Sequence, residues 1–269
     1  MKLLNGSELA GFIKERHARQ VSQLKSRGIQ PKLAIVQVKD DPVINTYVRL
    51  KQHYGADVGI EVEIHIPKQS EVSELLNKLS NDKSVHGIIV QLPLEDPSQT
   101  DEIVNMVTPE KDVDALGNDA KFEPATPMAI LWLLNGYNIG LADKHVLLIG
   151  RGKLVGTPLE KILKSSGIDV EVVGREAKNL GEYTKKADVV ITATGSPAIL
   201  YSDMIKHGAV VVDAGVASEE GKTVGDLAPE VYERDDLTIT PQKGGVGPLT
   251  VCALFENVIR AARKNVRPN

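Results

Sequence analysis

The sequence lacks the features of a secreted or membrane-bound protein. It contains one cysteine, Cys252, so no internal disulfide can form, which fits a reducing compartment. Its longest apolar runs, such as "GIIVQLPL" and "GAVVVDAGV", are far too short to span a bilayer. The first residues, "MKLLNGSELAGF", have no long apolar core of the kind that signal peptides carry. We therefore expect a cytoplasmic protein with no membrane partner.

Positive charge and metal-ligand patterns are also scarce. The net charge is −4 and the pI is about 5.9, which gives no support for a basic nucleic-acid-binding face. The six histidines are scattered without metal-ligand spacing, and we expect no metal site. Cys252 lies in an apolar helical pattern, which favours a buried small hydrophobic residue over a nucleophile.

Short apolar segments alternate with helical patterns along the 269 residues. Near-continuous apolar strands separated by helices indicate parallel sheets that are covered on both faces. The fold class we predict is α/β, with two domains, the second a Rossmann-type dinucleotide-binding domain, and a cleft between them. Ser70 or Ser73 is expected to cap the second helix. We expect strands within 31–38, 60–66, 85–94, 144–150, 169–174, 187–195 and 208–216, and helices within 47–59, 70–82, 157–167 and 251–262.

The segment "DALGNDAKFEPATP" is rich in glycine, asparagine and proline and has little periodicity, as is typical of a linker. We place a domain division near residue 118. The first domain then comprises residues 1–117 with the C-terminal helix 249–269, and the second comprises residues 118–248.

The stretch "HVLLIGRGKLVGTPLEKIL" predicts a phosphate-binding turn. An apolar strand runs into Gly150, Gly152 and Gly156, and Pro158 lies in the first turn of the following helix, where a missing N–H costs nothing. Glycines let the backbone approach a pyrophosphate at the free N–H groups of the helix start. The alternative is an ordinary tight βα turn.

Residues after the next strand bear on the choice of nucleotide. Arg151 and Arg175 together would suit the 2′-phosphate of NADP, whereas Glu176 suits the ribose hydroxyls of NAD. We expect NADP, with NAD possible. Farther on, "TATGSP" and "DAGV" place small residues at strand ends, where a nicotinamide ribose would lie against backbone; ordinary glycine turns are the alternative.

Tyr47 and Lys51 are four residues apart in a predicted helix, so they share one face. A Tyr-x-x-x-Lys pair occurs in short-chain dehydrogenases, but there the glycine loop comes first, whereas Tyr47 precedes Gly150 by 103 residues. Gln91 ends a predicted strand, where side chains face ligand crevices, and Asp114 lies in a turn-rich segment. Taken singly, each of these residues is better explained by a structural role. Tyr47 would pack its ring and Lys51 would extend into solvent. Gln91 would hydrogen-bond a neighbouring loop, and Asp114 would cap its turn.

The segments "YVRLK", "GIIVQLPL", "PEKDVDALG", "GRGKLVGTPL", "ADVVITATGSP" and "TPQKGGVGPLT" occur together, in this order. Over nearly its whole length, the chain resembles the bifunctional methylenetetrahydrofolate dehydrogenase/methenyltetrahydrofolate cyclohydrolase family. The resemblance implies a homodimer of one-carbon metabolism and purine biosynthesis that binds folate on its first domain and NADP on its second. It further implies oxidation of 5,10-methylenetetrahydrofolate and hydrolysis of the product to 10-formyltetrahydrofolate.

The resemblance also implies residue roles. Lys51 is the expected acid/base, Tyr47 and Gln91 support it, and Asp114 binds the pterin. The expected catalytic and substrate-binding residues are Tyr47, Lys51, Val90, Gln91, Leu92, Asp114, Gly244, Gly245 and Pro248. The expected cofactor-binding residues are Gly150, Arg151, Gly152, Val155, Gly156, Arg175, Thr194, Gly195 and Val216.

The chain departs from the family pattern at Ile44, Ala115, Gly152, Lys243 and the Gly174-Arg175 pair, where the family usually has serine, glycine, serine, proline and a His-Ser pair. Two other functions remain open at this point. One is a monofunctional NAD(P)-dependent methylenetetrahydrofolate dehydrogenase, and the other is a non-catalytic folate- or nucleotide-binding module. Lys51, Gln91 and Asp114 are all present, and we expect an active enzyme.

Overall fold

A computed structural model describes residues 1–219 and 222–264. The chain forms two compact units. The three-stranded unit contains residues 11–125 and the chain from Val251, and the six-stranded unit contains residues 1–10 and 126–250. The domain division predicted near residue 118 stays a prediction.

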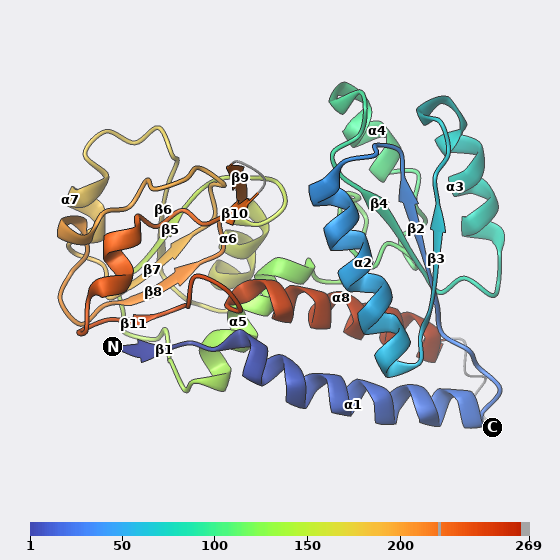
Figure 1. Ribbon diagram of the computed structural model, residues 1–269, viewed down its shortest axis with the longest axis horizontal. Helices are drawn as coiled ribbons and strands as arrows, with labels where there is room; N and C mark the ends of the chain where they lie inside the picture. Colours follow the sequence, from blue (N-terminus) through green and yellow to red (C-terminus); the bar gives the residue numbers. More distant parts are fainter. Residues whose placement is uncertain (220–221, 265–269) are drawn as a thin grey trace. The chain divides into compact units, whose positions relative to one another are not determined.

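The three-stranded unit has the parallel strand order β3-β2-β4 (Figure 1). Apolar side chains alternate between two buried faces, as predicted for covered parallel strands. On one face, strand residues such as Ala34 and Val90 pack with Leu76 and Val104 of the helices that follow β3 and β4. The elements are α1 (Gly6–Ser26, which begins in the six-stranded unit), β2 (Lys32–Gln37), α2 (Pro42–Val58), β3 (Glu61–His65), α3 (Val72–Asn81), β4 (Gly87–Gln91) and α4 (Thr100–Val104).

Local sequence explains where α2 begins and ends. The Asp41 carboxylate accepts hydrogen bonds from the backbone N–H groups of Val43 at 2.9 Å and Ile44 at 3.2 Å, and Pro42 occupies the first turn. Gly59 ends the helix in the left-handed conformation, with a φ of 83°. The predicted helix end at this glycine is therefore confirmed, whereas the predicted start at Tyr47 is wrong, because the Asp41 cap starts the helix at Pro42.

The prediction for the start of α3 is wrong. Neither Ser70 nor Ser73 caps it, because a short 3-10 helix, Gln69–Glu71, precedes α3 and its backbone continues directly into the first turn. At the start of that 3-10 helix, the Glu71 carboxylate instead accepts a hydrogen bond from the Lys68 N–H at 3.2 Å.

The strand order of the three-stranded sheet reverses at β2, because β3 pairs on one side of β2 and β4 pairs on the other. In open parallel sheets, ligands bind outside the carboxyl ends of the strands at such a point. Gln37 and Gln91, the last residues of β2 and β4, are direct partners there. The Gln37 amide donates to the Asn45 side chain at 2.6 Å and so ties the strand end to α2.

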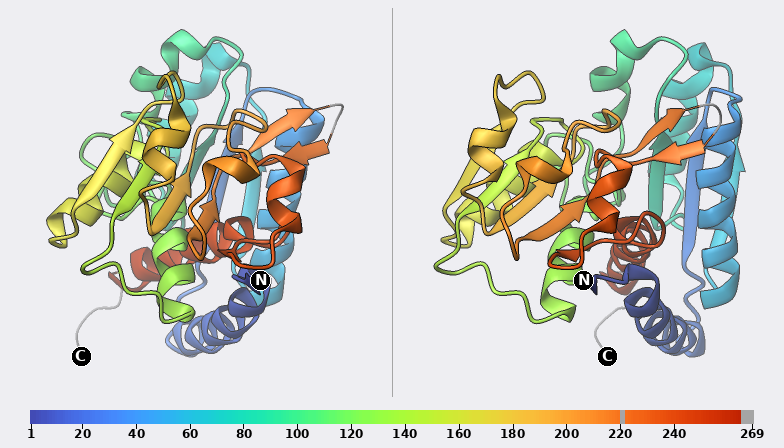
Figure 2. Two further views of the ribbon diagram at one scale, coloured as in Figure 1. Left: turned by 90° about the vertical axis from the view of Figure 1, so that its left-hand side faces the viewer. Right: turned by 60° about the vertical axis from the view of Figure 1, so that its left-hand side comes forward.

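The main sheet of the six-stranded unit has the strand order β1-β11-β8-β7-β5-β6, and all pairs in this sheet are parallel (Figure 2). In the same unit, β9 and β10 form a separate antiparallel pair. The strand order of the main sheet reverses at β5, with β6 on one side of β5 and β7 on the other, as in a Rossmann fold. The Rossmann-type prediction is confirmed. The elements are β1 (Lys2–Leu3), α5 (Ala125–Gly136), β5 (Val146–Ile149), α6 (Gly156–Ser165), β6 (Val170–Val173), α7 (Leu180–Thr184), β7 (Val189–Thr192), β8 (Val210–Asp213), β9 (Ala217–Glu219), β10 (Lys222–Val224) and β11 (Thr238–Ile239).

The last helix, α8 (Val246–Lys264), begins in the six-stranded unit and continues into the three-stranded unit. There Phe255 is fully buried against Gly55 and Tyr54 of α2. Cys252 is also fully buried, as predicted for a small hydrophobic residue, and burial raises the pKa of its thiol. Within residues 1–219 and 222–264, no helix combines the length and apolarity needed to cross a membrane.

Candidate active site

Lys51 and Gln91 meet at the carboxyl edge of the three-stranded sheet. The Lys51 Nζ donates to the Gln91 Oε1 at 2.6 Å, although the two residues are 40 positions apart in the chain. Lys51 lies on α2, which starts just after β2, and Gln91 is the last residue of β4. Burial lowers the pKa of the Lys51 ammonium, and the negative charge of Asp114 acts in the opposite direction. This lysine therefore loses its proton more readily than a lysine in water.

The position of Asp114 follows from the turn that contains it. Asp112 forms a parallel bridge with Ile88 of β4, so the next residues advance toward the carboxyl end of that strand. The buried Asp112 carboxylate accepts the Gly117 N–H at 2.8 Å and holds the turn closed. Burial raises the pKa of the Asp114 carboxyl, and the Lys51 charge opposes that rise. Asp114 and Lys51 are thus close enough to interact electrostatically.

The other expected residues of this unit surround the same strand end. Tyr47 is half-buried on α2, one turn before Lys51. Leu92 follows β4 and is also half-buried. Val90 points into the core, where it packs with the α3 and α4 side chains. Any contact of Val90 with a ligand would therefore be made by its backbone.

Ala115 adopts a left-handed backbone with a φ of 56°, which an alanine takes only at a cost of about 1–2 kcal/mol. Its place in the turn beside Asp114 explains why the family pattern has glycine there. We expect Ala115→Gly to raise the free energy of unfolding by about 0.5–1 kcal/mol, measured by urea denaturation. Ala18→Gly, in the middle of α1, is the matched control and is expected to lower it by a similar amount. Destabilisation by Ala115→Gly would contradict the proposed strain.

The glycine turn of the six-stranded unit is closely packed. Gly150 has a φ of 120°, and a Cβ there would lie 2.5 Å from the Ala193 oxygen. A Cβ at Gly156 would overlap the Gly150 oxygen. Gly152, in contrast, has no neighbouring atom within 4 Å of the position its Cβ would take. Two of the three glycines are thus required by close approach, and the third borders open space.

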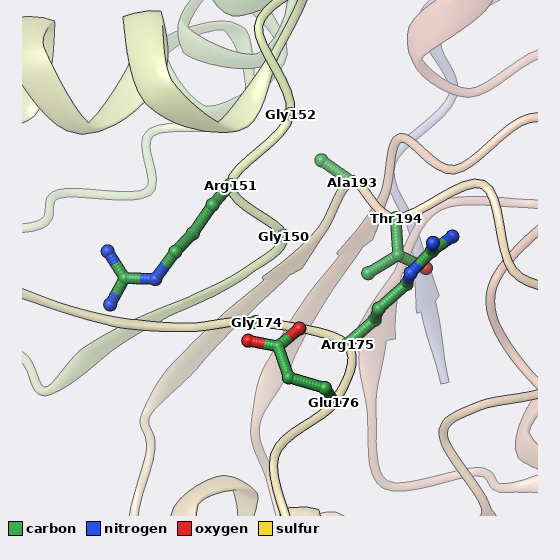
Figure 3. A pocket seen from close by; sticks show the side chains of 8 residues that line it. All are labelled: Gly150, Arg151, Gly152, Gly174, Arg175, Glu176, Ala193 and Thr194. Carbon is green, nitrogen blue, oxygen red and sulfur yellow. The ribbon is translucent and has the colours of Figure 1, made fainter.

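A pocket of about 250 Å³ opens beside this turn, next to β5, where the strand order of the sheet reverses (Figure 3). The Arg151 and Arg175 side chains point to different sides, and the Arg151 guanidinium donates to the Val172 oxygen at 2.6 Å. The Glu176 carboxylate turns back over Gly174. The lining residues are Gly150, Arg151, Gly152, Gly174, Arg175, Glu176, Ala193 and Thr194.

The pocket suits the phosphate groups of a dinucleotide. Its glycine turn leads into the N-terminus of α6, where no side chain caps the first N–H groups, and two arginines supply positive charge. Of the expected cofactor residues, Val155, Gly156, Gly195 and Val216 lie outside the pocket lining. Val155 and Gly156 lie at the start of α6, and a Cβ at Gly195 would lie 3.1 Å from the Val216 oxygen. The expected cofactor residues did not include Gly174, Glu176 or Ala193, although Glu176 carries the signal of an acidic residue after the second strand.

Three expected substrate residues belong to the six-stranded unit. Gly244 has a φ of 82°, and its oxygen accepts the Ser7 N–H at 2.9 Å. Gly245 is buried just before α8, and Pro248 lies in the first turn of that helix. The structure therefore gathers Tyr47, Lys51, Leu92, Gln91 and Asp114 in one unit and places Gly244, Gly245 and Pro248 in the other. Among the described residues, no group of three or more side chains could hold a metal ion.

Comparison with known proteins identifies the family. The catalytic-domain model of tetrahydrofolate dehydrogenase/cyclohydrolase matches residues 4–114, and the NAD(P)-binding-domain model of the same family matches residues 124–266. The chain is 38% identical to the bifunctional protein FolD of Campylobacter jejuni strain RM1221, with 99% of this chain and 100% of that protein covered.

Solved structures agree. The crystal structure of the Campylobacter jejuni bifunctional FolD dehydrogenase/cyclohydrolase has a TM-score of 0.93 at 38% identity and covers 99% of this chain and 100% of its own. The Trypanosoma brucei methylenetetrahydrofolate dehydrogenase-cyclohydrolase, complexed with NADP and an inhibitor, has a TM-score of 0.91 at 28% identity, with 99% and 98% covered. This chain therefore belongs to the tetrahydrofolate dehydrogenase/cyclohydrolase family.

Proposed function

We propose that Lys51 is the acid/base of a bifunctional methylenetetrahydrofolate dehydrogenase and methenyltetrahydrofolate cyclohydrolase. The hydrogen bond from Lys51 to Gln91 at 2.6 Å supports this assignment. It fixes an amine of lowered pKa at the carboxyl edge of the three-stranded sheet, where the strand order reverses. Asp114, beside it, is a carboxylate that suits the paired N–H donors of a pterin.

The dehydrogenase step removes hydride from the one-carbon bridge of 5,10-methylenetetrahydrofolate. NADP, when bound, supplies the hydride acceptor. The protein's part is to hold and orient the reactants. In this proposal, Asp114 and Tyr47 orient the folate, while the Gly150–Gly156 turn holds the pyrophosphate. Burial lowers the pKa of Lys51 and so makes its neutral form more accessible, and a neutral amine does not repel the cationic methenyl product.

The cyclohydrolase step adds water to the methenyl carbon and opens the ring to 10-formyltetrahydrofolate. A base must take one proton from the attacking water, and the ring nitrogen must gain a proton when its bond to carbon breaks. Lys51 can take the first proton and give it to the nitrogen, because its lowered pKa brings the neutral amine closer to neutral pH. The remaining hydroxyl proton of the adduct leaves to solvent as the formyl C=O forms. Gln91 accepts one N–H of Lys51. In this proposal the other hydrogens of the ammonium, or the lone pair of the amine, are thereby left for the substrate and the attacking water.

The two alternative functions are separated by one experiment. Purified protein is mixed with 5,10-methylenetetrahydrofolate and NADP+ or NAD+, and reduced nicotinamide is followed by absorbance together with the methenyl intermediate. We expect reduced nicotinamide and 10-formyltetrahydrofolate. With a monofunctional dehydrogenase, the methenyl compound would accumulate and then hydrolyse only at the uncatalysed rate. A non-catalytic module would give neither product. We also propose that the protein is cytoplasmic and forms a homodimer; gel filtration with light scattering would test the dimer, and cell fractionation the location.

Nucleotide preference is expected to depend on Arg175 and Glu176, which line the same pocket with opposite charges. Arg151 is engaged with Val172, which leaves Arg175 to pair with a 2′-phosphate. We expect Arg175→Ala to raise KM for NADP+ about tenfold or more and to change KM for NAD+ little. Glu176→Gln is expected to lower KM for NADP+ because it removes a negative charge. If Arg175→Ala raises both KM values equally, the assignment of a 2′-phosphate contact is wrong.

A further inference from the structure

Two carboxylates of the six-stranded unit, Asp213 and Asp226, are hydrogen-bonded to residues at the carboxyl ends of β7 and β8, and the proposed mechanism does not use them. Asp213 is the last residue of β8 and is the register partner of Thr192, the last residue of β7. Asp226 follows β10 and is fully buried. Buried carboxylates are costly unless their oxygens are hydrogen-bonded, and the partners of these two are informative.

Asp226 binds the loop that follows β7. Its Oδ2 accepts the backbone N–H of Thr194 at 2.8 Å, and its Oδ1 accepts the backbone N–H of Ser196 at 3.1 Å. Ala193 and Thr194 of that loop line the nucleotide pocket, and Ala193 packs against Gly150 of the glycine turn. One buried carboxylate thus holds the same loop that forms one wall of the pocket.

Asp213 holds Asp226 in place and binds the next loop. Its Oδ1 accepts the N–H groups of Gly215 at 2.9 Å and Asp226 at 3.2 Å, and also the Thr192 hydroxyl at 3.1 Å. The loops after β7 and β8 therefore share one connected network. In a low-dielectric interior such connected hydrogen bonds rigidify the groups they join.

Two glycines make room for the carboxylates in a reciprocal way. A Cβ at Gly215 would overlap the Asp226 carboxylate, and a Cβ at Gly225 would overlap the Asp213 carboxylate. The Asp226 carboxylate thus lies against Gly215, two residues after Asp213, and the Asp213 carboxylate lies against Gly225, the residue before Asp226. Burial raises the pKa of both groups, and the Asp226 charge raises that of Asp213 further.

We propose that Asp226, held by Asp213, is a positioning residue of the nucleotide site: it fixes residues 194–196 so that the pocket is formed before the nucleotide binds. The inference rests on the proposed NADP site in this pocket. Without the two hydrogen bonds from Thr194 and Ser196, the loop must be ordered at the moment of binding, and the cost appears as lost affinity.

The test is the affinity of NADP+ alone for wild type and Asp226→Asn, measured by isothermal titration calorimetry. An asparagine keeps one acceptor and turns an N–H₂ toward a backbone N–H, so the loop loses at least one bond. We expect Kd for NADP+ to rise at least about tenfold, which corresponds to about 1.4 kcal/mol. In the enzyme assay KM for NADP+ is expected to rise in parallel, while KM for methylenetetrahydrofolate stays within about twofold.

Asp236→Asn is the matched control. Asp236 is a mostly buried carboxylate of the same unit that accepts the Gly208 N–H at 2.9 Å and pairs with Arg234, but it lies at the amino ends of β8 and β11. We expect it to lower the melting temperature and leave Kd for NADP+ within about twofold. Equal Kd values for wild type and Asp226→Asn, or equal losses in the two variants, would overturn the proposal.

A milder variant serves if Asp226→Asn does not fold. Thr192→Val keeps the side-chain shape and removes the hydroxyl that donates to Asp213. Its Kd for NADP+ is expected to rise at least about threefold, and an unchanged Kd would contradict the network. If wild type itself does not bind NADP+, the proposed cofactor site fails first, and that result is distinct from failure of the positioning role.

Discussion

Lys51→Met is expected to reduce the rate of methenyltetrahydrofolate hydrolysis by about 10²–10⁴-fold, the range that general acid–base groups contribute. Methionine has about the length of the lysine stem and keeps its apolar packing, but it has no proton to give or take. Gln91 then loses the N–H that it accepts at 2.6 Å, and Asp114 loses a compensating charge. The measurement is the decay of methenyltetrahydrofolate absorbance, corrected for the uncatalysed reaction.

Lys111→Met is the control for this experiment. Lys111 belongs to the same unit, and burial lowers the pKa of its ammonium as it does for Lys51. Its Nζ donates to the backbone oxygens of Leu79 at 3.0 Å and Asp82 at 2.6 Å, and it therefore has a structural task. We expect Lys111→Met to lower stability and to leave the hydrolysis rate within about threefold. Equal rate losses in both variants would show a structural effect instead of a chemical one.

Gly156→Ala is expected to raise Kd for NADP+ about ten- to a hundredfold. A Cβ at this position overlaps the Gly150 oxygen, which is backbone and cannot rotate away. Relieving such overpacking costs about 1–3 kcal/mol and moves the turn that leads into α6. Calorimetric titration with NADP+ measures the loss.

Gly140→Ala is the matched control in the same unit. Gly140 lies outside the pocket lining and has no neighbouring atom within 4 Å of the position its Cβ would take, so the added methyl group displaces no atom of the protein. We expect Kd for NADP+ to stay within about threefold of wild type. If Gly156→Ala binds NADP+ like wild type, the close approach at this turn does not shape the nucleotide site.

Local sequence patterns were sufficient to predict much of the fold. Apolar runs such as residues 146–149 and 189–192 are strands because both of their faces are buried. The glycine turn could be predicted because φ near 120° at Gly150 and the close approach at Gly156 both exclude larger side chains. The approach of Lys51 to Gln91 was expected only from the resemblance to the family, since nothing local relates residues 40 positions apart.

Other features had no local signal. Strand β1 has two residues, too few for any periodicity, and it forms only by pairing with β11 at the other end of the chain. The hydrogen bonds of Asp226 to Thr194 and Ser196 cross about 30 residues and end on backbone groups, which any residue type provides. The cap expected at Ser70 or Ser73 failed because the chain enters α3 through a 3-10 turn, in which a cap side chain is not needed.

The pH dependence of methenyltetrahydrofolate hydrolysis tests the role of Lys51 most directly. Burial holds the pKa of Lys51 below its ordinary value of 10.5, so the neutral amine, which acts as the base, forms at lower pH than in a free lysine. The catalysed rate should therefore rise with pH, with a midpoint below 10.5, and level off above it, while Lys51→Met shows only the uncatalysed profile. A Lys51→Met profile that retains the wild-type rate and midpoint would contradict the account.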